Sequence, residues 1–547
     1  MKSPWFQHLR GVTAFVALTG GLLTGCARAP STASAPARES VGRRVAPPLP
    51  AIPLVDSALA IRVVYPPQDY RLPARTPSDS NFIFGSVGSG RATLTINGAS
   101  VPVAPNGAFL AWLPLPPGGP GDTLRYELVA TRGTDVAREE RRVLLRSRPE
   151  AVGSRPEAQP KDLAQAQGDS LAALPVFVRL GGAATPADTD RMVVGRPTPA
   201  GTYRWFFLPG TVAQLTGRSA GFARVRLDST LDVWVDSADA PLATEVRASP
   251  RRVTSNVRLR ADTARGFTDV VIRVTERPAY FVEETADALL VTLYDTKANT
   301  DQVAYGTLDR SVRSIEWEQV ANDRALYTIN LRRAPYGYMV MWEPGGLVVR
   351  VRDVPRIDPA NPLRGRVIAV DPGHPPAGAT GPTGLWEPQA ALWVSERLRD
   401  MLVARGARVI MTRTTMDAVG LGDRPTIARQ QGAEAFVSVH LNALPDGATP
   451  FAPRGSGTYF FHQHSEPLAR AVQRGLTENI GLLDEGVYKA NFAVVRNSPW
   501  FPGVLTEGLY LMHPAQENFL RTREGQERYA RGILEGLERY FASLAFP

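Results

Sequence analysis

The pattern of apolar residues changes at residue 363, and this change constrains the fold more than any other feature of the chain. Beyond it, short apolar runs alternate with amphipathic stretches of helical length. The apolar runs are VIAVD (367–371), RVIMT (408–412), AFVSVH (435–440), GTYFF (457–461), FAVVR (492–496) and VLTE (504–507). Helices are expected over 388–405, 424–431, 466–480 and 523–543. Alternating strands and helices predict an α/β domain at 363–547, with a mainly parallel sheet flanked by helices.

Upstream of this domain the sequence predicts three all-β units. Residues 60–148 hold short alternating runs between Gly, Pro and Asn turns, a spacing typical of an immunoglobulin-like β-sandwich. A Pro/Gln/Ala-rich linker follows at 149–172, and then a smaller unit at 173–245 whose segment 206–240 resembles bacterial SH3-like domains. Residues 246–356 alternate again and resemble β-rich wall-targeting modules. For each unit, a spacer without a ligand is the open alternative.

The N-terminus predicts export and a lipid anchor. Lys2 and Arg10 precede an apolar stretch, 12–23, and the sequence Leu-Thr-Gly-Cys follows at 23–26. That ending resembles the lipobox of bacterial lipoproteins, so 1–26 is expected to be a signal peptide and Cys26 the lipidated residue. The Pro/Ala/Ser-rich segment 27–59 would be the tether. Ala27 favours outer-membrane sorting, with the protein facing the periplasm. The alternative is an ordinary signal peptide with a chance cysteine.

Composition excludes some classes of protein. The chain has 44% hydrophobic and 21% charged residues, which is typical of globular domains. Its formal net charge is +9, but the basic residues are almost all arginine, and no nucleic-acid-binding motif accompanies them. Cys26 is the single cysteine, so no disulfide can form within the chain. We therefore expect no nucleic-acid partner.

Polar residues stand out where the predicted strands of the α/β domain end. His374, His440 and Glu507 each follow or end a strand, and Glu387 opens the first helix just before Pro388. Function in such sheets gathers outside the carboxyl ends of the strands. Two imidazoles and a carboxylate make a three-ligand zinc site with an open fourth position, and a second carboxylate can move protons. Taken singly, each residue has an ordinary alternative: a surface or core histidine, a helix cap, a surface carboxylate.

Two further histidines, His462 and His464, are two residues apart, so both would face the same side of a strand. Such pairs can bind metal, but we expect this one to be a surface feature without a ligand.

Four motifs carry a resemblance to a known family. They are VIAVDPGH (367–374), a helix opening at Glu387, SVHLNA (438–443) and VLTEGLY (504–510). With the arginine segments MTRTTMD (411–417) and LGDRPTIARQQGAE (421–434), they make residues 366–543 similar to the zinc-dependent N-acetylmuramoyl-L-alanine amidases, which cut peptide stems from peptidoglycan. The sequence departs from the family's usual pattern at Pro375, Pro376 and Pro388, and after Glu507.

The resemblance implies a mechanism and a partner. His374, Glu387 and His440 would be ligands of Zn²⁺, Glu507 the general base and acid, and Asn442 a substrate-positioning residue. The reaction would be hydrolysis of the amide bond between N-acetylmuramic acid and L-alanine of peptidoglycan. Two alternatives stay open: a zinc peptidase acting on the stem peptide, and a non-catalytic wall-binding lipoprotein with a degenerate amidase domain.

The segment after SVHLNA bears on regulation. Some relatives carry a long insertion there, forming a helix that covers the zinc until an activator displaces it. Here the segment is LPDGATPFAPRGS (444–456), which holds three prolines and two glycines and is too short and interrupted for a stable helix. We therefore expect no protein activator, and an isolated domain, 360–547, that is active.

Overall fold

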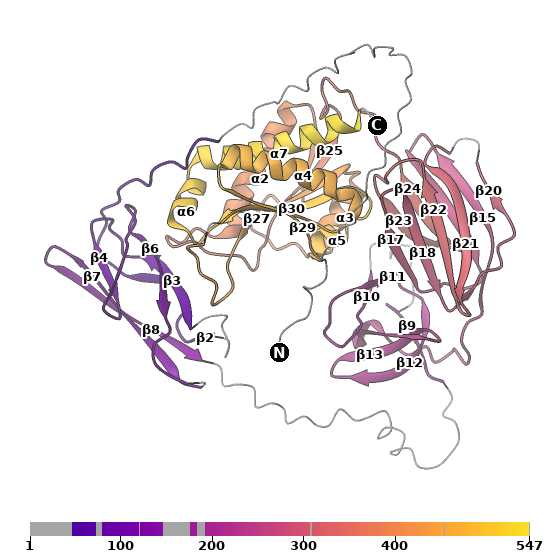
Figure 1. The fold of residues 1–547 in the computed structure, drawn as a ribbon, viewed down its shortest axis with the longest axis horizontal. Helices are drawn as coiled ribbons and strands as arrows, with labels where there is room; N and C mark the ends of the chain where they lie inside the picture. The colour runs from indigo at the N-terminus through magenta and orange to yellow at the C-terminus, as the bar shows by residue number, and fades with distance from the viewer. Residues whose placement is uncertain are drawn as a thin grey trace, which may run out of the picture. The chain divides into compact units, whose positions relative to one another are not determined.

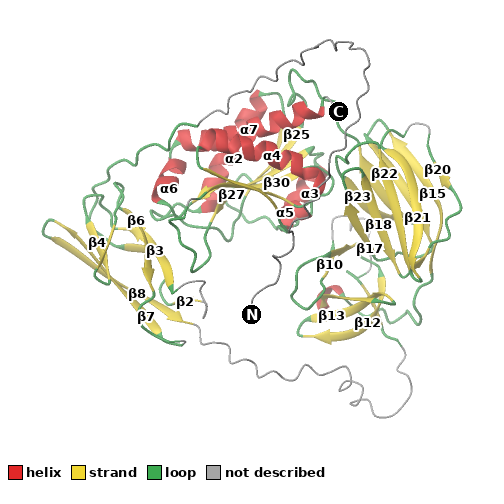
Figure 2. Ribbon diagram, viewed as in Figure 1, coloured by secondary structure: helices red, strands yellow, loops and turns green. Residues whose placement is uncertain are grey.

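The computed structural model describes residues 46–72, 79–119, 121–145, 175–182, 192–306, 309–452 and 454–545. The predicted signal peptide with Cys26, most of the tether and the linker 149–172 lie outside these residues. Within the described residues, no helix is both long and apolar enough to cross a membrane. Helices longer than a single 3₁₀ turn occur, in the described residues, only between 387 and 544, and everything upstream is built from strands (Figures 1 and 2).

Two sheets pack over a shared core in the first β unit. One sheet has the order β1 (Arg62–Tyr65), β3 (Ser80–Ser86), β6 (Ala108–Pro114). The other has the order β2 (Tyr70–Leu72), β8 (Asp135–Leu145), β7 (Thr123–Arg132), β4 (Thr93–Ile96), β5 (Ala99–Val101). Ile83 and Phe109 from the first sheet meet Leu94, Leu128 and Val143 from the second in one buried cluster. This is a β-sandwich, in which alternate residues of each strand face inward.

The second β unit is smaller. Its main sheet has the order β14 (Leu231–Asp236), β13 (Phe222–Asp228), β12 (Val212–Ser219), β9 (Phe177–Arg179), and β10 (Val193–Gly195) pairs with β11 (Trp205–Phe207). Phe207, Val225 and Val233 lie in its core. The SH3-like assignment of this unit stays a prediction.

The third β unit is again two sheets around one core. The first runs β19 (Thr296–Lys297), β15 (Arg252–Asp262), β16 (Phe267–Val274), β24 (Gly346–Arg352), β23 (Tyr338–Glu343), with β20 (Val303–Ala304) also on β15. The second runs β17 (Tyr280–Glu284), β18 (Ala288–Tyr294), β22 (Arg324–Leu331), β21 (Val312–Ala321). Val270 and Val349 of the first sheet pack with Val291 and Ile329 of the second.

The C-terminal domain contains a six-stranded sheet. Its order is β26 (Arg408–Met411), β25 (Val367–Pro372), β27 (Ala435–Asn442), β30 (Gly503–Tyr510), β28 (Gly455–Phe460), β29 (Leu483–Lys489). Neighbouring strands are parallel except β28 and β30, which are antiparallel. The carboxyl ends of β25, β27 and β30 therefore meet at one edge of the sheet, where the sequence places His374, His440 and Glu507.

Helices cover both faces of this sheet, because alternate residues of each strand face opposite sides. Ile368 and Val370 of β25 pack in a cluster with α2 (Glu387–Ala404), α4 (Glu466–Ile480) and α7 (Arg523–Leu544). Ala369, between them, packs in a second cluster with α3 (Asp423–Gln430) and α5 (Ala493–Arg496). A further helix, α6 (Pro514–Arg521), follows β30.

Two local predictions were wrong. FAVVR is not a strand, because residues 493–496 form the one-turn helix α5. The edge strand of the sheet is instead β29, with the sequence LDEGVYK. It lacks an apolar run because it is mostly exposed. His462 and His464 are not surface residues either. His464 is buried and His462 is mostly buried, and His464 bonds to Glu284 of β17.

Candidate active site

The turn after β25 holds His374 in a left-handed backbone conformation, with φ of 58°, which few residues other than glycine adopt. Two arginines hold this turn through hydrogen bonds to its backbone. Arg413 and Arg424 donate hydrogen bonds of 2.7 to 2.9 Å to the carbonyl oxygens of residues 372–374. The buried carboxylate of Asp371 balances the charge of Arg424 at 2.8 Å. Strained backbone persists where the surroundings fix it in this way, and the imidazole of His374 is therefore fixed at the sheet edge.

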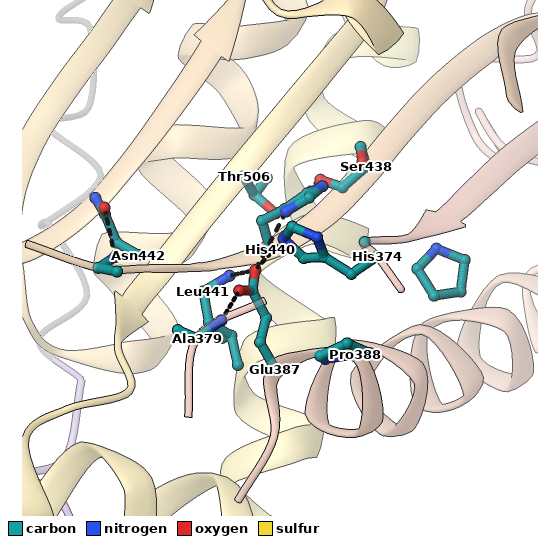
Figure 3. Close-up of polar contacts among 12 residues, drawn as sticks. His374, Ala379, Glu387, Pro388, Ser438, His440, Leu441, Asn442 and Thr506 are labelled. Carbon is teal, nitrogen blue, oxygen red and sulfur yellow. Dashed lines mark hydrogen bonds and ion pairs between the residues drawn. The ribbon is translucent and has the colours of Figure 1, made fainter. Parts of the chain in front are cut away.

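Three side chains converge in front of this turn (Figure 3). The carboxylate Oε1 of Glu387 lies 3.3 Å from Nε2 of His374 and 3.2 Å from Nδ1 of His440. One potential ligand atom from each residue lies within 4.8 Å of the other two. We call His374, Glu387 and His440 the metal group.

Glu387 is fixed and ionised in this position. Its Oε1 accepts the backbone N–H of Leu441 at 3.0 Å and its Oε2 that of Ala379 at 2.8 Å. Burial would raise the pKa of Glu387, but hydrogen bonds and charge from His374 and His440 outweigh it and hold the pKa well below its usual value. Glu387 was expected to open this helix, and it is the first residue of α2, directly after the N-cap residue Trp386.

Glycine at 373 is required by the position of His440. A Cβ atom at Gly373 would lie 2.6 to 2.7 Å from three atoms of the His440 ring. Any larger residue at position 373 would displace that imidazole from the metal group.

Glu507 lies beside the metal group without belonging to it. It is the neighbour of His440 in the parallel pair of β30 with β27. Its Oε2 atom is buried and has no hydrogen-bond partner in the described part of the chain. Burial, and after it the negative charge of Glu387, raises the pKa of Glu507 well above its usual value. A buried carboxyl oxygen without a hydrogen-bond partner costs free energy, and Glu507 keeps such an oxygen beside the metal group.

The metal group fits zinc. Two histidine nitrogens and a carboxylate oxygen are the donor set of zinc sites that keep a fourth position for water. Glu387 is held by two backbone N–H groups, as ligands usually are by further contacts. The missing side chain at Gly373 leaves space for the ring of His440.

Comparison with known proteins assigns the family. Residues 368–539 match the family model described as N-acetylmuramoyl-L-alanine amidase. The germination-specific N-acetylmuramoyl-L-alanine amidase of Bacillus subtilis is 30% identical over 202 residues, covering 34% of this chain and 84% of that protein. This chain belongs to the N-acetylmuramoyl-L-alanine amidase family.

Other amidases extend the comparison. The sporulation-specific N-acetylmuramoyl-L-alanine amidase of Bacillus subtilis is 32% identical over 181 residues, covering 32% of this chain and 68% of that protein. The probable cell wall amidase LytH of Staphylococcus epidermidis is 29% identical over 188 residues, covering 34% of this chain and 61% of LytH. The chain thus spans less than two thirds of the length of LytH.

The structure adds information on Asn442 and on two arginines of this member of the family. Asn442 lies outside the metal group (Figure 3). Its Oδ1 accepts the N–H of Ala443 at 2.9 Å, and its side chain also hydrogen-bonds Tyr459. Its role with substrate stays a prediction. Arg413 and Arg424 lie in the segments that resemble the family, but no role was expected for them from sequence, because most of their partners are backbone carbonyl oxygens, which no residue pattern marks.

Proposed function

We propose that this amidase is a zinc-dependent peptidoglycan hydrolase, cleaving the amide bond between N-acetylmuramic acid and L-alanine of the stem peptide. The observation that carries the proposal is the buried Oε2 atom of Glu507, which has no hydrogen-bond partner in the described residues and lies beside three convergent side chains that could hold a metal. A protein that only bound the wall would have no use for that carboxyl group.

The proposed chemistry assigns a step to each residue. His374, Glu387 and His440 would hold zinc, which when bound makes a water molecule more acidic and polarises the substrate carbonyl. Glu507 takes a proton from the attacking water as the water oxygen bonds to the lactyl carbonyl carbon. The carbon–nitrogen bond then breaks, and Glu507 returns the proton to the departing alanine nitrogen. The products are a glycan with a free lactyl carboxylate and a free stem peptide.

Digestion of purified peptidoglycan tests this function. The full mature chain is incubated with sacculi, with and without a chelator, and the soluble products are identified by mass spectrometry. We expect intact stem peptides that begin with L-alanine, and none in the presence of chelator. Cleavage within the stem would support the peptidase alternative, and no chelator-sensitive release would remove the amidase proposal.

The proposed location is the periplasmic face of the outer membrane, through a lipid on Cys26. The motif at 23–26 and the tether after it support this proposal. Cys26→Ala should move the protein out of the membrane fraction or leave the precursor uncleaved. Wild-type protein found wholly in the soluble periplasmic fraction would contradict the anchor.

We also propose that no protein activator is needed. The described residues of the segment 444–456 contain turns and the start of β28 but no helix, so none of them can form a helical plug over the metal group. Mature protein loaded with zinc should be active alone; a protein that binds zinc yet stays inert until a partner is added would contradict this.

A further inference from the structure

One part of the sheet face next to Glu507 carries no side chains. Gly457 of β28 is directly opposite Glu507 of β30, and Gly486 of β29 is opposite Gly457. Residues directly opposite each other in a sheet share a face. A Cβ at Gly486 would meet nothing within 4 Å, and the atoms nearest to one at Gly457 would belong to Tyr459 and Tyr488, at 3.5 Å. We call Gly457 and Gly486 the glycine strip.

Aromatic rings form the next row of the same face. Tyr459 is opposite Tyr488, and their rings stack with centroids 5.1 Å apart and planes 22° apart. Phe492 meets Tyr459 edge-on at 5.3 Å. Tyr488 and Phe492 are each 42% exposed. We call these three residues the ring cluster.

The ring cluster is electrostatically coupled to the active site. Burial, followed by the negative charge of Glu507, raises the pKa of Tyr459 to about 12. Asn442, two residues beyond His440, hydrogen-bonds the same tyrosine. The glycine strip thus runs from Glu507 across two strands, with the ring cluster along its side.

We propose that the ring cluster is a subsite for a sugar ring of the glycan strand, next to the muramic acid whose amide is cleaved. The inference rests on the proposed function, because it concerns how that substrate lies.

Flat rings favour the apolar face of a pyranose, and tyrosine hydroxyls can meet its polar edge. The carboxylates whose charge reaches Tyr459 are those of Glu507 and Glu485, and Glu485 also accepts the hydroxyl of Tyr510 at 3.0 Å. The carboxylate of Glu485 disfavours a carboxylate of the stem peptide beside it and leaves a neutral amino sugar as the better occupant.

The test compares two soluble substrates with the same stem peptide, one carrying a disaccharide and one only N-acetylmuramic acid. For the full mature chain with zinc, we expect a KM lower by about 3- to 10-fold for the disaccharide substrate. Tyr488→Ala and Phe492→Ala should remove this preference while leaving kcat nearly unchanged. Tyr488→Phe keeps the ring, and Leu483→Ala removes an apolar side chain of β29 that is 50% exposed; both should retain the preference.

A binding measurement separates this inference from the proposed function. Calorimetry with a peptide-free disaccharide of N-acetylglucosamine and N-acetylmuramic acid needs no turnover. It should show weaker binding to metal-free Tyr488→Ala than to metal-free wild type. Equal binding, an unchanged KM ratio, or equal losses on both substrates would overturn the sugar subsite. Wild-type protein that binds the disaccharide but cleaves neither substrate would refute the proposed function and leave the subsite standing.

Discussion

The C-terminal domain contains two sets of two histidines with a glutamate nearby, and they are built differently. In the metal group, one glutamate oxygen lies between two imidazole nitrogens, at 3.3 and 3.2 Å. The second set is His462, His464 and Glu284, which we call the closed group. Here both glutamate oxygens lie 3.0 Å from the same nitrogen of His464, and His462 donates instead to the carbonyl oxygen of Arg496 at 2.8 Å.

A metal site requires more than the right residue types, because the ligand atoms must also point to one place. In the closed group the two imidazoles stack, with planes 11° apart, so their nitrogens do not aim at a shared point. Its glutamate is satisfied by a single histidine, which also supplies a backbone N–H at 2.7 Å. Among the described residues, only the metal group brings three ligand atoms together, and only beside it does a buried carboxyl oxygen of a glutamate lack a partner.

The largest expected contrast is in metal content. His440→Ala should lose zinc, because only two ligands of the metal group remain. His464→Ala should keep one zinc per chain, because the closed group is expected to hold none. Metal analysis of the purified variants by mass spectrometry measures both. A His464→Ala protein without zinc would contradict the assignment of zinc to the metal group alone.

Glu507→Gln should separate metal binding from turnover. The variant should bind zinc as wild type does, since Glu507 is not a ligand, and should lose about 10³-fold in kcat because the amide cannot carry the proton. Stem-peptide release and zinc content are measured on the same preparation. A near wild-type rate would mean that another group moves the proton.

The closed group should matter for stability rather than for chemistry. The side chains of His464 and Glu284 are 0% and 5% exposed, and His464→Ala leaves a buried carboxylate without its partner. The free energy of unfolding should fall by about 3–5 kcal/mol, as measured by denaturant titration. Adding Glu284→Gln should recover part of that loss; full additivity of the two changes would show that the pair is not coupled.

Strong periodic patterns made much of the C-terminal domain predictable. The helix expected over 466–480 is α4, and the runs at 367–371, 435–440 and 504–507 lie in β25, β27 and β30. The sheet edge where His374, His440 and Glu507 gather follows from the rule for parallel strands.

The features that could not be predicted from sequence depend on distant partners, or belong to a strand that is mostly exposed. β29 was missed because an edge strand has little apolar pattern, and with it the pairing of Tyr488 with Tyr459. The burial of His464 depends on Glu284, which is remote in the chain and could not be paired with it from sequence. The hold of Arg413 and Arg424 on the His374 turn depends on backbone carbonyls, which carry no sequence signal.

A pH titration of stability tests the burial of His462 in the closed group. Burial, together with the charge of His464, lowers the pKa of His462 to about 4, from 6.5 when unfolded. Between these values the unfolded chain binds the extra proton, so stability falls as the pH drops from about 6.5 toward 4, by up to roughly 3 kcal/mol.

His462→Gln keeps a donor for the carbonyl of Arg496 but cannot titrate. The variant should therefore lose less stability than wild type between pH 7 and 5. Metal-free protein is used for both, because acid also releases metal from histidine ligands. Parallel pH curves for the two proteins would rule out His462 as the titrating group.

The smallest expected effect is at Asp446, in the segment that joins β27 to β28. Asp446 in this segment accepts hydrogen bonds from side chains of the first β unit: Tyr70 and Asn81 at 3.0 Å each, and Tyr65. Asn81 in return accepts the N–H of Gly447 at 3.2 Å. Asp446→Ala removes these bonds without touching the metal group, and should lower the free energy of unfolding by about 1–2 kcal/mol.

The hydrogen bonds of Asp446 to the first β unit also bear on the expected effect of truncating the chain. The isolated domain, 360–547, lacks Tyr65, Tyr70 and Asn81, so Asp446 can satisfy its carboxylate with water there. Zinc content and kcat on soluble muropeptides should match those of the full mature chain, since neither the metal group nor Glu507 contacts the first β unit in the hydrogen bonds described. A truncated domain that binds zinc but loses most of its kcat, with Asp446→Ala in the full chain doing the same, would show that this contact positions the active site. In that case the first β unit would be part of the catalytic machinery, and the metal group would depend on remote contacts as the closed group does.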